Sequence, residues 1–123
     1  RYIIDVMEAC IDGTLDKISL EFADNAAVCV VIASGGYPEA YEKGKVITGL
    51  DKFEGKTLYR CYHAGTSFDA DRNIVTSGGR VLGVVAIGDT LKEARANAYE
   101  AAGWVHFDKM YMRSDIGKAR DAV

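Results

Sequence analysis

The chain has 123 residues, of which 49% are hydrophobic and 27% are charged, and these proportions are ordinary for a folded globular protein. Its length is that of one domain with one core. The net charge of −3 and the pI near 5.3 argue against nucleic acid or an anionic membrane surface as partner. No apolar run approaches the roughly 20 residues that a membrane-spanning helix needs.

The chain begins with apolar residues at helical spacing, which are Ile3, Ile4, Met7 and Ile11. Gly13 follows as a stop signal, so a helix is predicted over about residues 1–12. The first residue is Arg1 and not Met, and the helical pattern starts at once; we therefore expect the chain to come from a longer protein. Residues 18–22 alternate apolar and polar side chains, which fits a short strand or an extended connector.

The most apolar segment, Ala27–Ala33, predicts a core strand, and its continuous hydrophobicity predicts cover on both faces. Residues Thr57–Ala64 and Arg80–Ile87 predict two more strands, because they are rich in β-forming side chains. Shorter strands are expected at Lys45–Ile47 and at Asn73–Thr76, the latter as one arm of a hairpin.

After these strands the hydrophobic period changes from 2 to 3.6, which predicts a helix over residues 90–105. Thr90 and Glu93 have the spacing of a capping box, in which each side chain accepts a hydrogen bond from the other's backbone N–H. The tail, residues 107–123, is expected to pack in part and then fray. A group of short strands with one helix before and one after it predicts an α+β fold with a mostly antiparallel sheet.

Two glycine pairs border the most apolar strands and are the first candidate site. Gly35 and Gly36 follow the first strand, and Pro38 gives their loop a fixed shape. Paired glycines leave backbone N–H groups open to an anion, and Lys43 or Lys45 supplies the opposite charge. The same residues equally suit a plain tight turn with solvated lysines, and neither standard phosphate-loop signature is present.

The second pair, Gly78 and Gly79, precedes the last strand and is followed by Arg80. A guanidinium fork matches a phosphate or a carboxylate, although a hairpin turn with a surface arginine has the same pattern. If the two apolar strands are antiparallel neighbours, both glycine turns lie at the same end of the sheet. That arrangement favours one shared anion site.

Other chemistries find little support in the sequence. Ser34 and His63 have no carboxylate at a spacing that would complete a nucleophilic triad, and His63 is predicted to be a half-buried strand residue. The cysteines at positions 10, 29 and 61 show no paired spacing. They are predicted to be reduced, buried thiols of a cytoplasmic protein. No catalytic residue and no metal site is expected.

The chain resembles the C-terminal part of the phosphoribosylamine–glycine ligase (glycinamide ribonucleotide synthetase) family. The segments that carry the resemblance are, in chain order, Ala27–Pro38, Tyr41–Gly49, His63–Thr66, Gly78–Gly83, Gly88–Thr90, Glu93–Arg95, Ala98–Glu100 and Arg113–Gly117. Together they span nearly the whole chain from Ala27 onward. Glu39-Ala40 departs from the family, which often has small residues after the proline.

This resemblance implies a small antiparallel β-sheet or half-barrel with a flanking C-terminal helix, the C-terminal domain of an ATP-grasp ligase. It implies that residues 26–123 form that domain, and that residues 1–25 are the last helix of the ATP-grasp domain and a connector. The family joins glycine to 5-phosphoribosylamine in purine biosynthesis. ATP and Mg (or Mn) would bind mainly to the missing domains, on which this part packs, with no cofactor in this part.

The expected substrate contacts follow from the family motifs and the glycine chemistry together. They are Ser34, Gly35, Gly36, Tyr37, Pro38, Lys43, Gly78, Gly79 and Arg80. This part alone is expected to be inactive. Two alternatives stay open from the sequence: an interface domain without ligand contact, and a stand-alone module that binds a phosphorylated metabolite.

Overall fold

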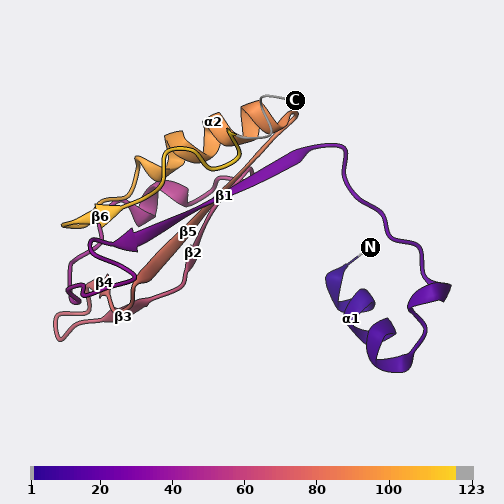
Figure 1. The fold of residues 1–123 in the computed structure, drawn as a ribbon, viewed down its shortest axis with the longest axis horizontal. Coiled ribbons are helices and arrows are strands. Elements are labelled where there is room, and N and C mark those ends of the chain that lie inside the picture. Colours follow the sequence, from indigo (N-terminus) through magenta and orange to yellow (C-terminus); the bar gives the residue numbers. More distant parts are fainter. Residues whose placement is uncertain (1, 119–123) are drawn as a thin grey trace.

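The computed structural model describes residues 2–118, which form two helices, six strands and two short 3-10 helices (Figure 1). The elements are α1 (Ile3–Asp12), η1 (Leu15–Lys17), β1 (Ala26–Ser34), η2 (Leu50–Phe53), β2 (Tyr59–His63), β3 (Thr66–Phe68), β4 (Ile74–Thr76), β5 (Arg80–Gly88), α2 (Leu91–Ala102) and β6 (Met110–Tyr111). The α+β class that the sequence predicts is confirmed.

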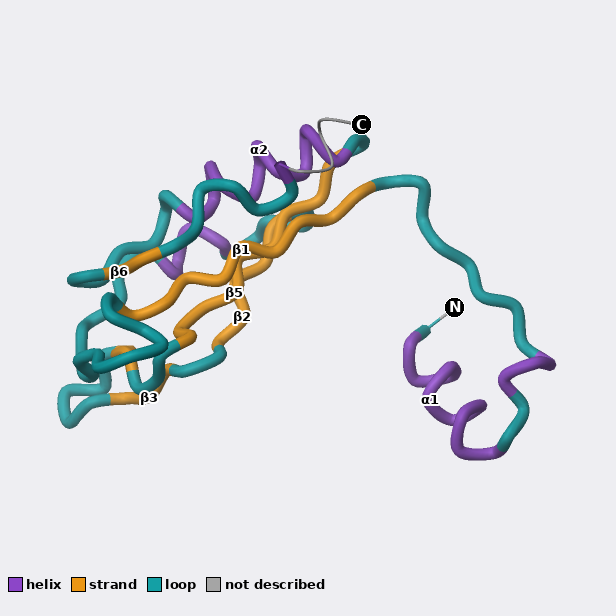
Figure 2. Tube along the Cα trace, viewed as in Figure 1, coloured by secondary structure: helices purple, strands orange, loops and turns teal. Residues whose placement is uncertain are grey.

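The main sheet has four strands in the order β2-β5-β1-β6, and every neighbouring pair is antiparallel. The long strands β1 and β5 form its centre, with Val30 opposite Val84 and Ile32 opposite Leu82. A small separate hairpin, β3-β4, confirms the predicted hairpin arm at residues 74–76. Figure 2 shows that long loops join the strands at the end of the sheet opposite the start of α2.

Helix α2 lies along one face of the sheet and forms the core with it (Figure 1). Its alanines at positions 94, 98, 101 and 102 are fully buried, because short side chains let the helix approach the strands closely. Val30, Leu82 and Val84 meet them from the sheet and are equally buried. After the helix, Phe107 returns to the core with an exposed fraction of 1%.

The predicted start of α2 is confirmed in part. The Thr90 hydroxyl accepts a hydrogen bond from the backbone N–H of Glu93 at 3.2 Å. The Glu93 carboxylate, however, accepts from the N–H of Asp89 at 3.1 Å, one residue before the predicted donor. The helix also ends earlier than predicted, at Ala102, because Gly103 closes it. Residues 119–123, where the tail was expected to fray, lie outside the described residues.

Helix α1 lies apart from the sheet, joined to it by an extended segment (Figure 1). Residues 18–22 form the connector and not the strand, since the structure assigns them no strand. The apolar side chains of α1 stay exposed: Ile3, Ile4, Met7 and Ile11 keep fractions of 58–83%. Within the part of the chain that the structure describes, no helix is long and apolar enough to cross a membrane.

Three sequence predictions about burial and strands are wrong. Within residues 2–118, strand β1 is covered on one face only, because α2 packs on a single side of the sheet and Cys29 and Val31 point away from it. Residues 45–47 form no strand and contribute one isolated bridge, from Val46 to Val75. The cysteines are free, as predicted, but Cys10 and Cys29 are exposed and Cys61 is only half-buried.

Candidate functional site

The two glycine turns meet at one end of the sheet, as the antiparallel pairing of β1 and β5 requires. Ser34 joins them: its backbone N–H donates to the Gly79 carbonyl at 2.7 Å, and its hydroxyl donates to the Gly78 carbonyl at 2.8 Å. Ser34 is only 4% exposed. Its hydroxyl therefore holds the two turns together and is used within the protein.

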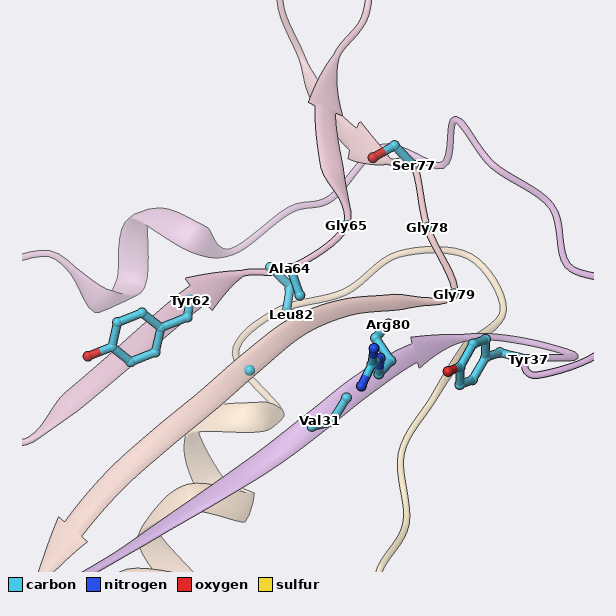
Figure 3. Close-up of a pocket in the computed structure, with 11 residues that line it drawn as sticks. Val31, Tyr37, Tyr62, Ala64, Gly65, Ser77, Gly78, Gly79, Arg80 and Leu82 are labelled. Carbon is cyan, nitrogen blue, oxygen red and sulfur yellow. The ribbon is translucent and has the colours of Figure 1, made fainter. Parts of the chain in front are cut away.

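Arg80 begins β5 directly after the second turn and is exposed at the junction. It lines a hollow of about 570 Å³, the larger hollow, together with Tyr37, Gly78, Gly79 and other residues of the same end. Figure 3 shows the Arg80 side chain close to Val31, with the Tyr37 ring beside it and Gly78 and Gly79 above it in this view. Among the residues that the structure describes, the Arg80 guanidinium has no hydrogen-bond or ion-pair partner. It is therefore free to bind an anion.

A smaller hollow of about 280 Å³ adjoins the larger one, and Val31, Tyr37 and Arg80 line both. Its walls are mostly apolar, and Arg113 stands among them. Arg113 donates two hydrogen bonds to the Asp115 carboxylate, at 2.8 and 2.6 Å. This contact lowers the pKa of Asp115 and raises that of Arg113. The charge of Arg113 is thus already paired with a carboxylate, in contrast to that of Arg80.

Glycine is required at this junction because other chain atoms occupy the space of a side chain. A Cβ on Gly79 would lie 1.9 Å from Cδ2 of the Tyr37 ring. A Cβ on Gly65 would lie 2.4 Å from the Arg80 carbonyl oxygen and 3.0 Å from Cα of Gly78. The Tyr37 ring thus packs directly on the second turn. The peptide bond between Tyr37 and Pro38 is cis.

The predicted site residues do not all reach the same place. Tyr37, Gly78, Gly79 and Arg80 line the larger hollow, whereas Ser34, Gly35, Gly36, Pro38 and Lys43 line neither hollow. Gly35 lies against Lys109, the residue before β6, because a Cβ there would be 2.6 Å from the Lys109 carbonyl oxygen. Gly36 has a φ of 97°, which favours glycine.

The lysines near the first turn are engaged elsewhere. Lys45 forms ion pairs with Glu42 at 2.9 Å and with Asp108 at 3.6 Å, and Lys109 also contacts Glu42 at 3.2 Å. The two lysines lower the pKa of Glu42 by hydrogen bonding to its carboxylate. Lys43 lies with its Nζ 6.0 Å from the centre of the Tyr41 ring. The positive charge at the junction therefore comes from Arg80.

Sequence reasoning missed seven residues of the larger hollow, which are Val31, Tyr62, Ala64, Gly65, Ser77, Leu82 and Gly83. Gly65 belongs to the segment His63–Thr66 that carries the family resemblance, so a signal for it was present. Tyr62 had no signal beyond its place in a strand. His63 is exposed and not half-buried, and its Nδ1 lies 2.9 Å from the Thr66 hydroxyl.

The arrangement is suited to holding an anion and not to activating a nucleophile. A single unpaired guanidinium faces an open hollow with glycine backbone along one wall, and a phosphate or a carboxylate matches its fork. Within residues 2–118, no group of three or more His, Cys, Asp or Glu residues is placed to hold a metal ion.

Comparison with known proteins adds a family to this geometry. The family described as "Phosphoribosylglycinamide synthetase, C domain" matches residues 27–119. A phosphoribosylamine–glycine ligase from Caldanaerobacter subterraneus is 48% identical over 113 residues, and the chloroplastic enzyme of Arabidopsis thaliana is 42% identical over 113 residues. These matches cover 92% and 91% of this chain, but only 26% and 21% of the relatives.

A solved structure shows the same likeness in three dimensions. The crystal structure of phosphoribosylamine–glycine ligase from Thermotoga maritima has a TM-score of 0.63 and 44% sequence identity to this chain. The match covers 73% of this chain and 21% of that one. The chain thus spans about a quarter of the length of the curated relatives it matches.

Proposed function

This chain belongs to the phosphoribosylglycinamide synthetase C-domain family, and we propose that it serves as the C-terminal domain of a phosphoribosylamine–glycine ligase. In this proposal the complete enzyme uses ATP to join glycine to 5-phosphoribosylamine, which gives glycinamide ribonucleotide. Residues 26–123 are the C-terminal domain, and residues 1–25 are the end of the ATP-grasp domain with a connector. ATP and its Mg or Mn ion bind to the rest of the enzyme.

Within that enzyme we assign Arg80 to the phosphate of 5-phosphoribosylamine. The observation that carries this assignment is the unpaired guanidinium at the edge of the larger hollow, beside the backbone of Gly78 and Gly79. A charge-assisted hydrogen bond to a phosphate contributes about 1.5–3 kcal/mol. Tyr37 packs on Gly79 and sets the position of the turn. Lys43 and Ser34 belong to the support of the loop in this assignment.

The test uses the full-length ligase with Arg80→Ala. The KM for 5-phosphoribosylamine should rise by about 10- to 100-fold, since a contact of about 1.5–3 kcal/mol is lost, while the KM for ATP should not change. Arg72→Ala is the matched control, because Arg72 is an exposed arginine in the β3-β4 turn and lines neither hollow.

Two results would contradict this function. Equal changes in both Michaelis constants would make Arg80 a structural residue and the chain an interface domain without ligand contact. A wild-type full-length enzyme that does not join glycine to 5-phosphoribosylamine would refute the ligase assignment itself.

A further inference from the structure

The segment that follows β6, residues 112–117, forms one wall of the smaller hollow, and we call it the strap. Met112, Arg113 and Ile116 of the strap line that hollow. Met112 and Ile116 are also partly buried against the core between α2 and the sheet. The strap is therefore a packed part of the protein, although the structure assigns it no helix or strand.

Two side chains of α2 hold the strap by its backbone. The Tyr99 hydroxyl donates to the Arg113 carbonyl and accepts from the Ile116 N–H, the latter at 3.0 Å. The Arg95 guanidinium donates to the Ile116 carbonyl at 3.0 Å. These hydrogen bonds fix the backbone on both sides of Asp115. Helix α2 thus sets the positions from which the side chains of the strap extend.

Arg113 and Asp115 form a closed ion pair on this fixed backbone. Arg113 donates from Nε and Nη2 to the two carboxylate oxygens of Asp115, at 2.8 and 2.6 Å. Exposed ion pairs contribute little in general, but a bidentate fork between arginine and a carboxylate is the favourable case. The Asp115 carboxylate is therefore engaged in the folded protein.

This ion pair borders the hollow into which the unpaired Arg80 also faces. Arg80 and Arg113 both line the smaller hollow. Among residues 2–118, no Asp or Glu lines this hollow or the larger one. If Arg113 released Asp115, a free carboxylate and a free guanidinium would be present at the same hollow, and opposite charges attract. The ion pair in the strap therefore bears on whether Arg80 stays free.

We propose, on the basis of the function proposed above, that Arg113 is a positioning residue for phosphate binding. It keeps Asp115 engaged, and it thereby keeps Arg80 free for the phosphate of 5-phosphoribosylamine. Arg113 itself does not contact the substrate. Without Arg113, the Asp115 carboxylate pairs with Arg80 and competes with the phosphate, and the fraction of Arg80 that stays free then sets the apparent affinity.

The kinetic test compares Arg113→Ala, Asp115→Asn and the double variant in the full-length ligase. Arg113→Ala should raise the KM for 5-phosphoribosylamine about fivefold, which corresponds to an Arg80 that is free for about a fifth of the time. It should leave kcat and the KM for ATP unchanged, because saturating substrate displaces the carboxylate. The double variant should recover the normal KM, since no carboxylate is left to compete. Asp115→Asn alone should keep that KM as well.

The titration of Asp115 gives a second readout, which needs no ligase activity. NMR follows the Asp115 carboxyl in the 123-residue chain, and the dispersion of the amide signals verifies that each variant is folded. In Arg113→Ala the pKa of Asp115 should stay below its ordinary value of 3.8, because Arg80 takes over the carboxylate. It should return toward that value when Arg80→Ala is added. Arg72→Ala, added instead as the matched control, should leave the pKa lowered.

The inference is overturned if Arg113→Ala leaves the KM for 5-phosphoribosylamine unchanged, or if the double variant does not recover it. The latter result would make Arg113 a direct ligand of the substrate or a purely structural residue. An ordinary pKa of Asp115 in Arg113→Ala alone would also refute the inference, since Arg80 would then not capture the carboxylate. Arg80→Ala in the full-length ligase decides the phosphate contact separately, and its failure leaves the titration of Asp115 unaffected.

Discussion

At the scale of single residues, the contact between Tyr37 and Gly79 decides how the two glycine turns fit together. The ring occupies the position that a side chain on Gly79 would need. This contact links residues that are far apart in the sequence, and each turn alone gives no sign of it. Arg80 follows Gly79 directly, so the same contact also fixes the backbone position from which the Arg80 side chain extends.

Gly79→Ala should therefore destabilise the protein by about 1–3 kcal/mol, because the ring or the turn must move. In a chain that also carries Tyr37→Ala, the same change should cost much less. Urea unfolding of the two single variants and the double variant measures this coupling. Gly78→Ala is the control, since a Cβ there would lie 3.3 Å from Cα of Gly65 and 3.6 Å from the Arg80 carbonyl oxygen.

No coupling between the two changes, or an equal cost at Gly78 and Gly79, would mean that the ring moves aside freely. In that case Tyr37 would not set the position of the second turn.

At the scale of elements, the β3-β4 hairpin closes through a turn that is tied by one carboxylate. Asp69 accepts hydrogen bonds from the backbone N–H groups of Asp71 and Asn73, at 2.9 and 2.8 Å. Between these two donors lies Arg72, which has a φ of 66°. Residues other than glycine are disfavoured at such positive φ values because their Cβ crowds the backbone. The turn thus contains one unfavourable residue.

Arg72→Gly should stabilise the protein by about 0.5–1 kcal/mol, since glycine removes the strain and loses part of that gain through its greater freedom in the unfolded chain. Urea unfolding at neutral pH measures the change. Arg72→Ala keeps Cβ and should be nearly neutral. If glycine at this position lowers stability instead, the arginine side chain contributes a contact of its own.

The elements also show what sequence patterns determine. The positions of β1, β5 and α2 follow from hydrophobic period, and the Thr90 cap follows from spacing, so these were predictable. The bare face of β1 was not predictable. A continuous apolar run indicates that both faces of a strand are apolar, but it does not indicate what covers them. At the site, the meeting of the glycine turns followed from antiparallel pairing. The ion pairs of Lys45 with Glu42 and Asp108 could not be predicted in this way, since they depend on tertiary contacts.

At the scale of the whole molecule, three carboxylates in separate regions are held ionised by local contacts. Lys45 and Lys109 lower the pKa of Glu42, the backbone N–H of Asn73 lowers that of Asp69, and Arg113 lowers that of Asp115. In the unfolded chain these groups return to ordinary pKa values, near 4.5 for Glu and 3.8 for Asp. The folded form therefore binds fewer protons than the unfolded one in this range.

A lowered pKa in the folded state stabilises the protein above the ordinary pKa, and this stabilisation is lost as the pH falls through the folded value. Stability should hold from neutral pH to about pH 5 and then decline below about pH 4. Urea unfolding at a series of pH values measures the slope. Asp69→Asn removes one of the titrating groups and should make the decline shallower; an unchanged slope would contradict the role of Asp69.

The strand order has a consequence for synthesis of the chain on the ribosome. Strand β1 ends at Ser34, but its neighbours β5 and β6 begin only at Arg80 and Met110, and β2 also pairs only with β5. The most apolar segment therefore leaves the ribosome long before any partner strand exists. During that interval it is an unpaired, aggregation-prone strand, and translation halted before Arg80 yields a product that cannot form the sheet.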